Sequence, residues 1–185
     1  DHFRIDPRLG DEEDFAWLID ECSARGIHIM LDGVFNHVAR THPWVEQGLA
    51  GDTDWEGHGE LATLHHADPA VRDAVGEIML HWLRRGIAGW RLDVAYAVPA
   101  DFWADVLARV RSEFPDAMFL GEVIHGDYSS IGKAGSLDAV TQYELWKATW
   151  SSLVDVNFWE LAHALERHPA AVSYTHLTLP TICSV

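Results

Sequence analysis

The sequence predicts an α/β protein with a parallel sheet, and two observations support this fold class. First, short apolar runs alternate with stretches of helical periodicity, as in βαβ units. The four runs that have the length of buried strands lie at residues 27–34, 87–94, 117–123 and 137–140. Second, three of the runs carry an acid at or near the carboxyl end: Asp32, Asp93 and Glu122. Because an α/β barrel builds its active site from the carboxyl ends of its strands, we predict part of a TIM-type (β/α)8 barrel.

The predicted helices follow from capping residues and apolar spacing. The acids at 11–14 favour the amino end of a helix that Gly26 ends. Pro69 suits the first turn of the next helix, which Gly86 ends. Apolar spacing predicts three further helices, at residues 99–114, 143–153 and 158–167. Residues 38–69 are polar and rich in glycine, which predicts a long loop of the kind that is more often functional than idle.

Composition sets the size and the class of the protein. The chain has 185 residues, 48% of them hydrophobic, which is enough for one domain but short of the about 250 residues of a complete barrel. A formal net charge of -16 argues against nucleic acid and anionic membranes as partners and fits a neutral substrate. The two cysteines, Cys22 and Cys183, form no disulfide framework or metal pair, and we expect Cys22 to be a small buried residue.

Asp93 and Glu122 are the candidate catalytic pair. They end successive predicted strands, and neighbouring parallel strands lie about 4.8 Å apart. Carboxyl groups at adjacent strand ends can therefore meet the spacing of about 5–5.5 Å of a retaining glycosidase, in which one is the nucleophile and the other the acid/base. The alternative is a structural Arg–Asp pair and a solvated glutamate. The joint placement of the two acids favours catalysis.

Three neighbouring residues are candidates for binding substrate. Arg91 shares a strand face with Asp93 and is expected to keep that carboxyl ionised, whereas Glu122 would need a raised pKa. Asp32 can orient Arg91 through an ion pair. His37 can hydrogen-bond a sugar hydroxyl, although a lone histidine in a loop is more often structural.

Other polar and aromatic residues have a structural interpretation beside the functional one. Asn36 can bind calcium through its amide oxygen, but a turn-capping role is more common. His65 and His66 are adjacent in sequence and are therefore poor metal co-ligands, so we expect no metal and no cofactor. Trp44 and Trp55 lie in the long loop, where stacking on sugars and core packing or a lid role stay open. Three tryptophans on predicted helix faces are expected in the core: Trp17, Trp82 and Trp103.

Three motifs resemble the signatures of the α-amylase family of glycoside hydrolases, also called family 13. Residues 32–37, DGVFNH, are similar to its first signature. Residues 89–93, GWRLD, are similar to the second, which holds the nucleophile, and residues 121–123, GEV, to the third, which holds the acid/base. The loop length and Trp90 are similar to cyclomaltodextrinases and neopullulanases.

The resemblance implies a partial catalytic barrel over residues 1–171, comprising strands three to six, with residues 38–69 as a short form of the domain between strand three and helix three. The family's fourth signature, Phe-x-x-Asn-His-Asp, does not occur in the sequence, so the third catalytic aspartate is missing and this polypeptide is expected to be inactive. Residues 172–185 resemble the translation of a transposase adapter used in sequencing libraries, so we expect a non-native tail there; the alternative is a genuine β-strand.

The expected function is that of a retaining glycoside hydrolase acting on α-linked gluco-oligosaccharides through a covalent glycosyl-enzyme, in a longer parent protein. A transglycosylase or isomerase of the same family, of the trehalose synthase type, stays open, as does a non-catalytic carbohydrate- or partner-binding relative. The expected partner is an α-glucan or oligosaccharide, with no nucleic acid or membrane. The sequence specifies neither oligomeric state nor compartment, and the bacterial cytoplasm is only the default expectation.

Overall fold

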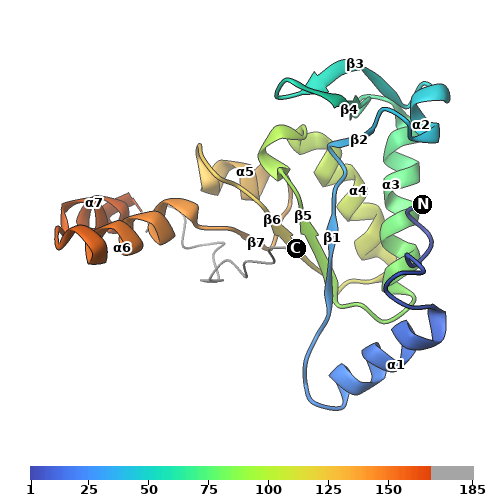
Figure 1. Ribbon diagram of the computed structural model, residues 1–185, viewed down its shortest axis with the longest axis horizontal. Coiled ribbons are helices and arrows are strands. Elements are labelled where there is room, and N and C mark those ends of the chain that lie inside the picture. Colours follow the sequence, from blue (N-terminus) through green and yellow to red (C-terminus); the bar gives the residue numbers. More distant parts are fainter. Residues whose placement is uncertain (168–185) are drawn as a thin grey trace.

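A sheet of four parallel strands forms the centre of the computed structural model, which describes residues 1–167 (Figure 1). Its strand order is β1-β5-β6-β7, and the strands are β1 (Met30–Gly33), β5 (Gly89–Leu92), β6 (Met118–Gly121) and β7 (Ala139–Val140). All four predicted strands are therefore confirmed, although the paired segments are shorter than the apolar runs that predicted them. The predicted tail at 172–185 lies outside the described residues.

Helices separate these strands, and two of them pack together against one face of the sheet (Figure 1). These two are α3 (Pro69–Leu83) and α4 (Ala100–Glu113). Outside residues 38–69, the remaining described helices are α1 (Glu12–Ser23), the short 3-10 turn η1 (Ala95–Ala97), α5 (Tyr128–Ala134), α6 (Tyr143–Asp155) and α7 (Trp159–Arg167). The helices expected from spacing are confirmed, whereas α5 was not predicted. It is too short to show helical apolar spacing, and its clearest sequence signal is the capping residue Asp127.

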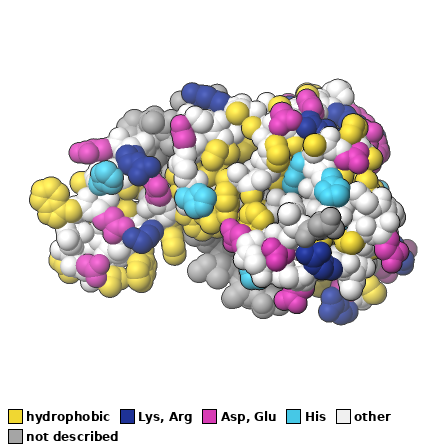
Figure 2. Space-filling model, turned by 90° about the horizontal axis from the view of Figure 1, so that it is seen from above, with side chains coloured by type: hydrophobic (Ala, Val, Ile, Leu, Met, Phe, Trp, Pro, Cys, Tyr) yellow, Lys and Arg dark blue, Asp and Glu magenta, His cyan; other side chains and the backbone are white. Residues whose placement is uncertain are grey.

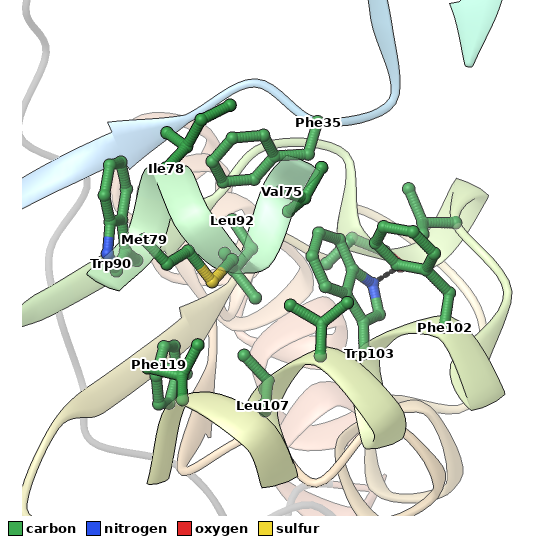
Figure 3. Close-up of a cluster of buried hydrophobic side chains, with 14 of the residues drawn as sticks. Phe35, Val75, Ile78, Met79, Trp90, Leu92, Phe102, Trp103, Leu107 and Phe119 are labelled. Atoms are coloured by element: carbon green, nitrogen blue, oxygen red, sulfur yellow. Dashed lines mark hydrogen bonds between the residues drawn. The ribbon is translucent and has the colours of Figure 1, made fainter. Parts of the chain in front are cut away.

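The core lies between the sheet and helices α3 and α4 (Figure 3). Side chains alternate along β5, so Trp90 and Leu92 point into this core, and Arg91 between them points to the opposite face. Trp103 is buried on α4 and donates its indole N–H to the carbonyl of Ala95 at 3.1 Å. Two faces of one sheet thus have two roles: one holds the core, and the other carries the charged residues.

The prediction that residues 38–69 form a loop is wrong. A three-stranded antiparallel sheet in the order β2-β4-β3 occupies this segment and lies beyond the carboxyl end of β1 (Figure 1). Its elements are β2 (His37–Ala39), α2 (Pro43–Glu46), β3 (Ala50–Trp55) and β4 (His58–Leu64). Ala62 and Leu64 alternate inward along β4, which gives the small sheet an apolar face. A tight turn joins β3 to β4 with positive φ at both Glu56 and Gly57, as the type I′ hairpin requires.

Two expectations about buried residues are also wrong. Trp17 leaves 65% of its surface exposed, because α1 lies at the surface and contains no buried residue. For the same reason Cys22, on the same helix, is half-buried. Trp82 is buried as expected.

Helices α6 and α7 pack on each other and project from the sheet (Figure 1). Hydrophobic side chains gather on the surface of this arm, at the left of Figure 2. The exposed members from these helices and the turn between them are Trp146, Trp150, Leu153, Val154, Val156, Phe158, Trp159 and Leu165. Over residues 1–167, every helix falls short of the length and hydrophobicity needed to span a membrane.

Candidate active site

The carboxyl ends of β1, β5 and β6 bring the three predicted acids to one edge of the sheet. Asp32 on β1 is aligned with Arg91 on β5. Asp93 and Glu122 directly follow β5 and β6, and their backbone N–H groups extend the ladder by donating to the carbonyls of Gly33 at 3.1 Å and of Leu92 at 2.8 Å. Backbone pairing therefore fixes where both acids leave the sheet.

Arg91 joins all three carboxylates. One guanidinium nitrogen, Nη1, donates to Asp32 Oδ1 at 2.6 Å and to Asp93 Oδ1 at 2.9 Å. The other, Nη2, lies 2.8 Å from Glu122 Oε1. Only 12% of the Glu122 side chain is exposed, against 55% for Asp32. Burial alone would lower the pKa of Arg91, but the three carboxylates raise it above its ordinary value, so this cation is permanent.

The protonation preferences of the two central acids differ from those expected from the sequence. Burial raises the pKa of Asp93, the charges of Glu122 and Asp32 add to this rise, and Arg91 only partly offsets it. Burial also raises the pKa of Glu122, but the Val94 N–H, the Tyr143 hydroxyl and the charge of Arg91 together hold it below its ordinary value. The directions of the two pKa shifts are therefore the reverse of those expected from the sequence.

His37 approaches this cluster from the small sheet. Its ring stacks on Trp55, with the two centroids 5.9 Å apart and the planes at 14°. Burial lowers the pKa of His37, with a further contribution from His58, although the negative charge of Asp93 opposes the change. The ring is therefore neutral at pH 7, close enough to feel the charge of Asp93, and able to donate or accept one hydrogen bond.

The remaining candidate ligands hold the small sheet in place. A ring nitrogen of His66 lies 3.0 Å from the carbonyl oxygen of Phe35, and one of His65 lies 2.9 Å from that of Gly48. Buried Asn36 lies next to His37, with its amide nitrogen 3.3 Å from the ring Nδ1. Within residues 1–167, no group of three or more His, Cys, Asp or Glu side chains could hold a metal ion.

Two contacts to Glu122 could not be predicted from the motifs. The Tyr143 hydroxyl donates to Glu122 Oε1 at 2.9 Å, and the backbone N–H of Val94 donates to Oε2 at 3.2 Å. Val94 has φ 41° and ψ 43°, a left-handed conformation that is strained for a β-branched residue. The available signal was position, because Tyr143 follows β7 just as Asp93 and Glu122 follow their strands.

The fold and this edge define an α/β-barrel segment with a centre of carboxylates joined by one arginine. The protein-family model of the alpha-amylase catalytic domain matches residues 1–56 and 53–168 of this chain. This chain belongs to the alpha-amylase family. It is 34% identical over 175 residues to a cyclomaltodextrinase of a Bacillus species, covering 80% of this chain and 31% of that protein. It is 32% identical over 168 residues to neopullulanase 2 of Thermoactinomyces vulgaris, covering 77% of this chain and 28% of that protein.

Solved structures give the same family. The ligand-free cyclic alpha-maltosyl-(1→6)-maltose hydrolase of Arthrobacter globiformis superposes with a TM-score of 0.82 at 26% identity, over 92% of this chain and 44% of that one. A cyclomaltodextrinase superposes with a TM-score of 0.80 at 30% identity, over 95% of this chain and 34% of that one. The chain thus spans less than half of these structures and about three-tenths of the two curated relatives, and its sheet is part of their barrel.

Proposed function

We propose that this chain is a segment of a retaining glycosidase that cleaves α-linked gluco-oligosaccharides, with Asp93 as nucleophile and Glu122 as acid/base. The observation that supports this most is the convergence of Asp93 and Glu122, at the ends of adjacent strands, on the one guanidinium of Arg91. Neighbouring strand ends suit the separation of about 5–5.5 Å of a retaining pair, whereas inverting glycosidases place water between acids about 6.5–9.5 Å apart. The names of the curated relatives support the substrate class.

The proposed reaction has two displacements. Asp93 attacks the anomeric carbon while Glu122 gives its proton to the departing glycosidic oxygen, which forms a glycosyl–Asp93 ester. Glu122 then takes a proton from water, whose oxygen attacks the anomeric carbon and releases Asp93. Asp32 orients Arg91, and neutral His37 binds a hydroxyl of the attacked sugar. The chemistry uses carboxyl groups and water alone, so we propose no cofactor.

We also propose that this polypeptide by itself hydrolyses no glycosidic bond. Attack requires an ionised Asp93 and a protonated Glu122, whereas here the surroundings raise the pKa of Asp93 and lower that of Glu122. A bound sugar that excludes water from Glu122 would raise the pKa of Glu122, as an acid catalyst requires. The Phe-x-x-Asn-His-Asp signature that would bring a third carboxylate is also missing from the sequence.

The test uses the longer protein that carries this segment, with cyclodextrin or maltotriose as substrate. Proton NMR of the first product should show the α-anomer, because two displacements retain configuration. A fluorinated glucosyl fluoride, which slows hydrolysis of the intermediate, should label the peptide that contains Asp93. Asp93→Asn should abolish turnover, whereas Asp20→Asn on exposed α1 should not. A β-anomeric first product, or labelling elsewhere, would contradict the proposal.

A second assay tests the polypeptide of 185 residues itself. Incubation with maltose, cyclodextrin or pullulan should release no glucose or maltose above the rate of the Asp93→Asn variant. Release that Asp93→Asn abolishes would show that the segment is active alone and would overturn this part of the proposal.

A further inference from the structure

Tyr143 reaches Glu122 from outside the family motifs. It begins α6, shortly after the end of β7, and its hydroxyl donates to Glu122 Oε1 at 2.9 Å. The phenol is half-buried, and Glu122 is the acceptor that its hydroxyl hydrogen uses. The contact therefore joins the start of α6 to the carboxylate that follows β6.

The two oxygens of Glu122 are held by different groups. Oε2 accepts from the Val94 N–H at 3.2 Å, so it is bound to the backbone next to Asp93. Oε1 accepts from Tyr143 and lies 2.8 Å from Arg91 Nη2. The guanidinium also binds Asp32 and Asp93, so it cannot follow Glu122 alone. Tyr143 is therefore the neutral side chain that fixes the rotation of this carboxyl about its terminal bond.

We propose that Tyr143 is a positioning residue for Glu122, holding its carboxyl plane in one orientation between Val94 and Arg91. This inference rests on the proposed acid/base role of Glu122. A donor to the carboxylate favours the ionised form, so Tyr143 also resists the protonation that the first displacement requires. A Glu122 protonated on Oε2 still accepts from Tyr143 at Oε1, so the same contact can orient the acid form.

The experiment titrates Glu122 in this chain by carbon NMR, with glutamate carboxyl groups labelled and the Glu122 signal assigned by its loss in Glu122→Gln. Tyr143→Phe removes one oxygen and should shift the titration midpoint of Glu122 upward. Tyr96→Phe is the matched control, because burial and then nearby carboxylates, Glu122 among them, raise the pKa of Tyr96, yet its ring packs on His125. That variant should leave the midpoint unchanged.

A reciprocal measurement keeps the inference testable if Tyr143→Phe does not fold. Burial, the hydrogen bond to Glu122 and its charge raise the pKa of Tyr143. Glu122→Gln should therefore lower the Tyr143 midpoint, followed with ring-labelled tyrosine. An unchanged Glu122 midpoint in folded Tyr143→Phe, an equal shift in Tyr96→Phe, or an unchanged Tyr143 midpoint in Glu122→Gln would overturn the inference.

These titrations need no activity, so they fail independently of the proposed function. If they fail while the longer protein gives retained configuration, Tyr143 loses its positioning role and Glu122 keeps its own. If they succeed while that protein inverts configuration or labels elsewhere, the acid/base role of Glu122 is the part that is wrong, and the inference about catalysis falls with it.

Discussion

Replacing Arg91 with glutamine should destabilise the fold in a way that depends on pH. The variant leaves Asp93 and Glu122 facing each other without their cation, with 21% and 12% of their side chains exposed. Removing one partner of a buried ion pair costs about 3–5 kcal/mol. Asp32 is more than half exposed, and a glutamine amide retains some hydrogen bonding, so we expect a loss of about 2–3 kcal/mol at pH 7.

The sign of the pH dependence follows from the carboxyl groups. The folded state of the wild type holds the pKa of Glu122 below its ordinary value, so that stabilisation is present above the unfolded pKa and is lost as pH falls through the folded pKa. Without Arg91, the folded-state pKa values of Asp93 and Glu122 rise, and their protonation in acid removes the repulsion. The difference between variant and wild type should therefore be largest at neutral pH and shrink on acidification.

Urea unfolding at about pH 7 and about pH 4.5, followed by circular dichroism, measures both effects. Arg8→Gln is the control, because Arg8 pairs with Asp6 on the surface with 86% of its side chain exposed, where solvent screens the ion pair. An Arg91→Gln loss that is equal at both pH values, or no larger than that of Arg8→Gln, would refute the reasoning.

Three further predictions concern the fold. Gly89→Ala should prevent stable folding, since a Cβ there would lie 2.0 Å from a backbone oxygen of β6. Gly59→Ala places its Cβ in open space and should change the free energy of unfolding by less than about 0.5 kcal/mol. Circular dichroism and urea midpoints distinguish the two variants. Trp103→Ala should cost about 3–5 kcal/mol by urea unfolding, and Trp17→Ala on exposed α1 close to nothing. Burial, aided by a nearby histidine and the amino terminus, lowers the pKa of His2 to about 4. As pH falls, the unfolded state therefore binds a proton at this residue before the folded state does. Stability should fall as pH is lowered from about 6.5 toward 4. His2→Phe should flatten that slope, and an unchanged slope would contradict this assignment.

The sequence was most informative for features that depend on the spacing of residues along the chain. Apolar runs predicted the central strands because a strand buried on the core side needs residues such as Trp90 and Leu92. The acids at strand ends were predictable for the same reason, since parallel strands end at one edge and Arg91 lies in register with Asp32. These features depend on period and position, which a single sequence contains.

Features that depend on contacts between distant segments could not be predicted. Residues 38–69 are polar, so their composition did not predict the small sheet. Its strands pair with one another, and the buried ring of His66 contacts the carbonyl of Phe35. Tyr143 lies 21 positions after Glu122 in the chain, yet its hydroxyl touches that carboxylate. Burial raises the pKa of Asp93, and the Tyr143 contact is one of the causes that lower the pKa of Glu122; a motif encodes neither effect.

The order of strands in the central sheet has a consequence for synthesis. Because β1, β5, β6 and β7 lie side by side in the same order as in the chain, each strand pairs with the one made before it. A chain that leaves the ribosome amino end first can therefore extend one edge of the sheet at a time, as domains that fold during translation do. After β1, each strand of this sheet has its first partner already made when it emerges, and the edges of β5 and β6 are open only until the next strand emerges.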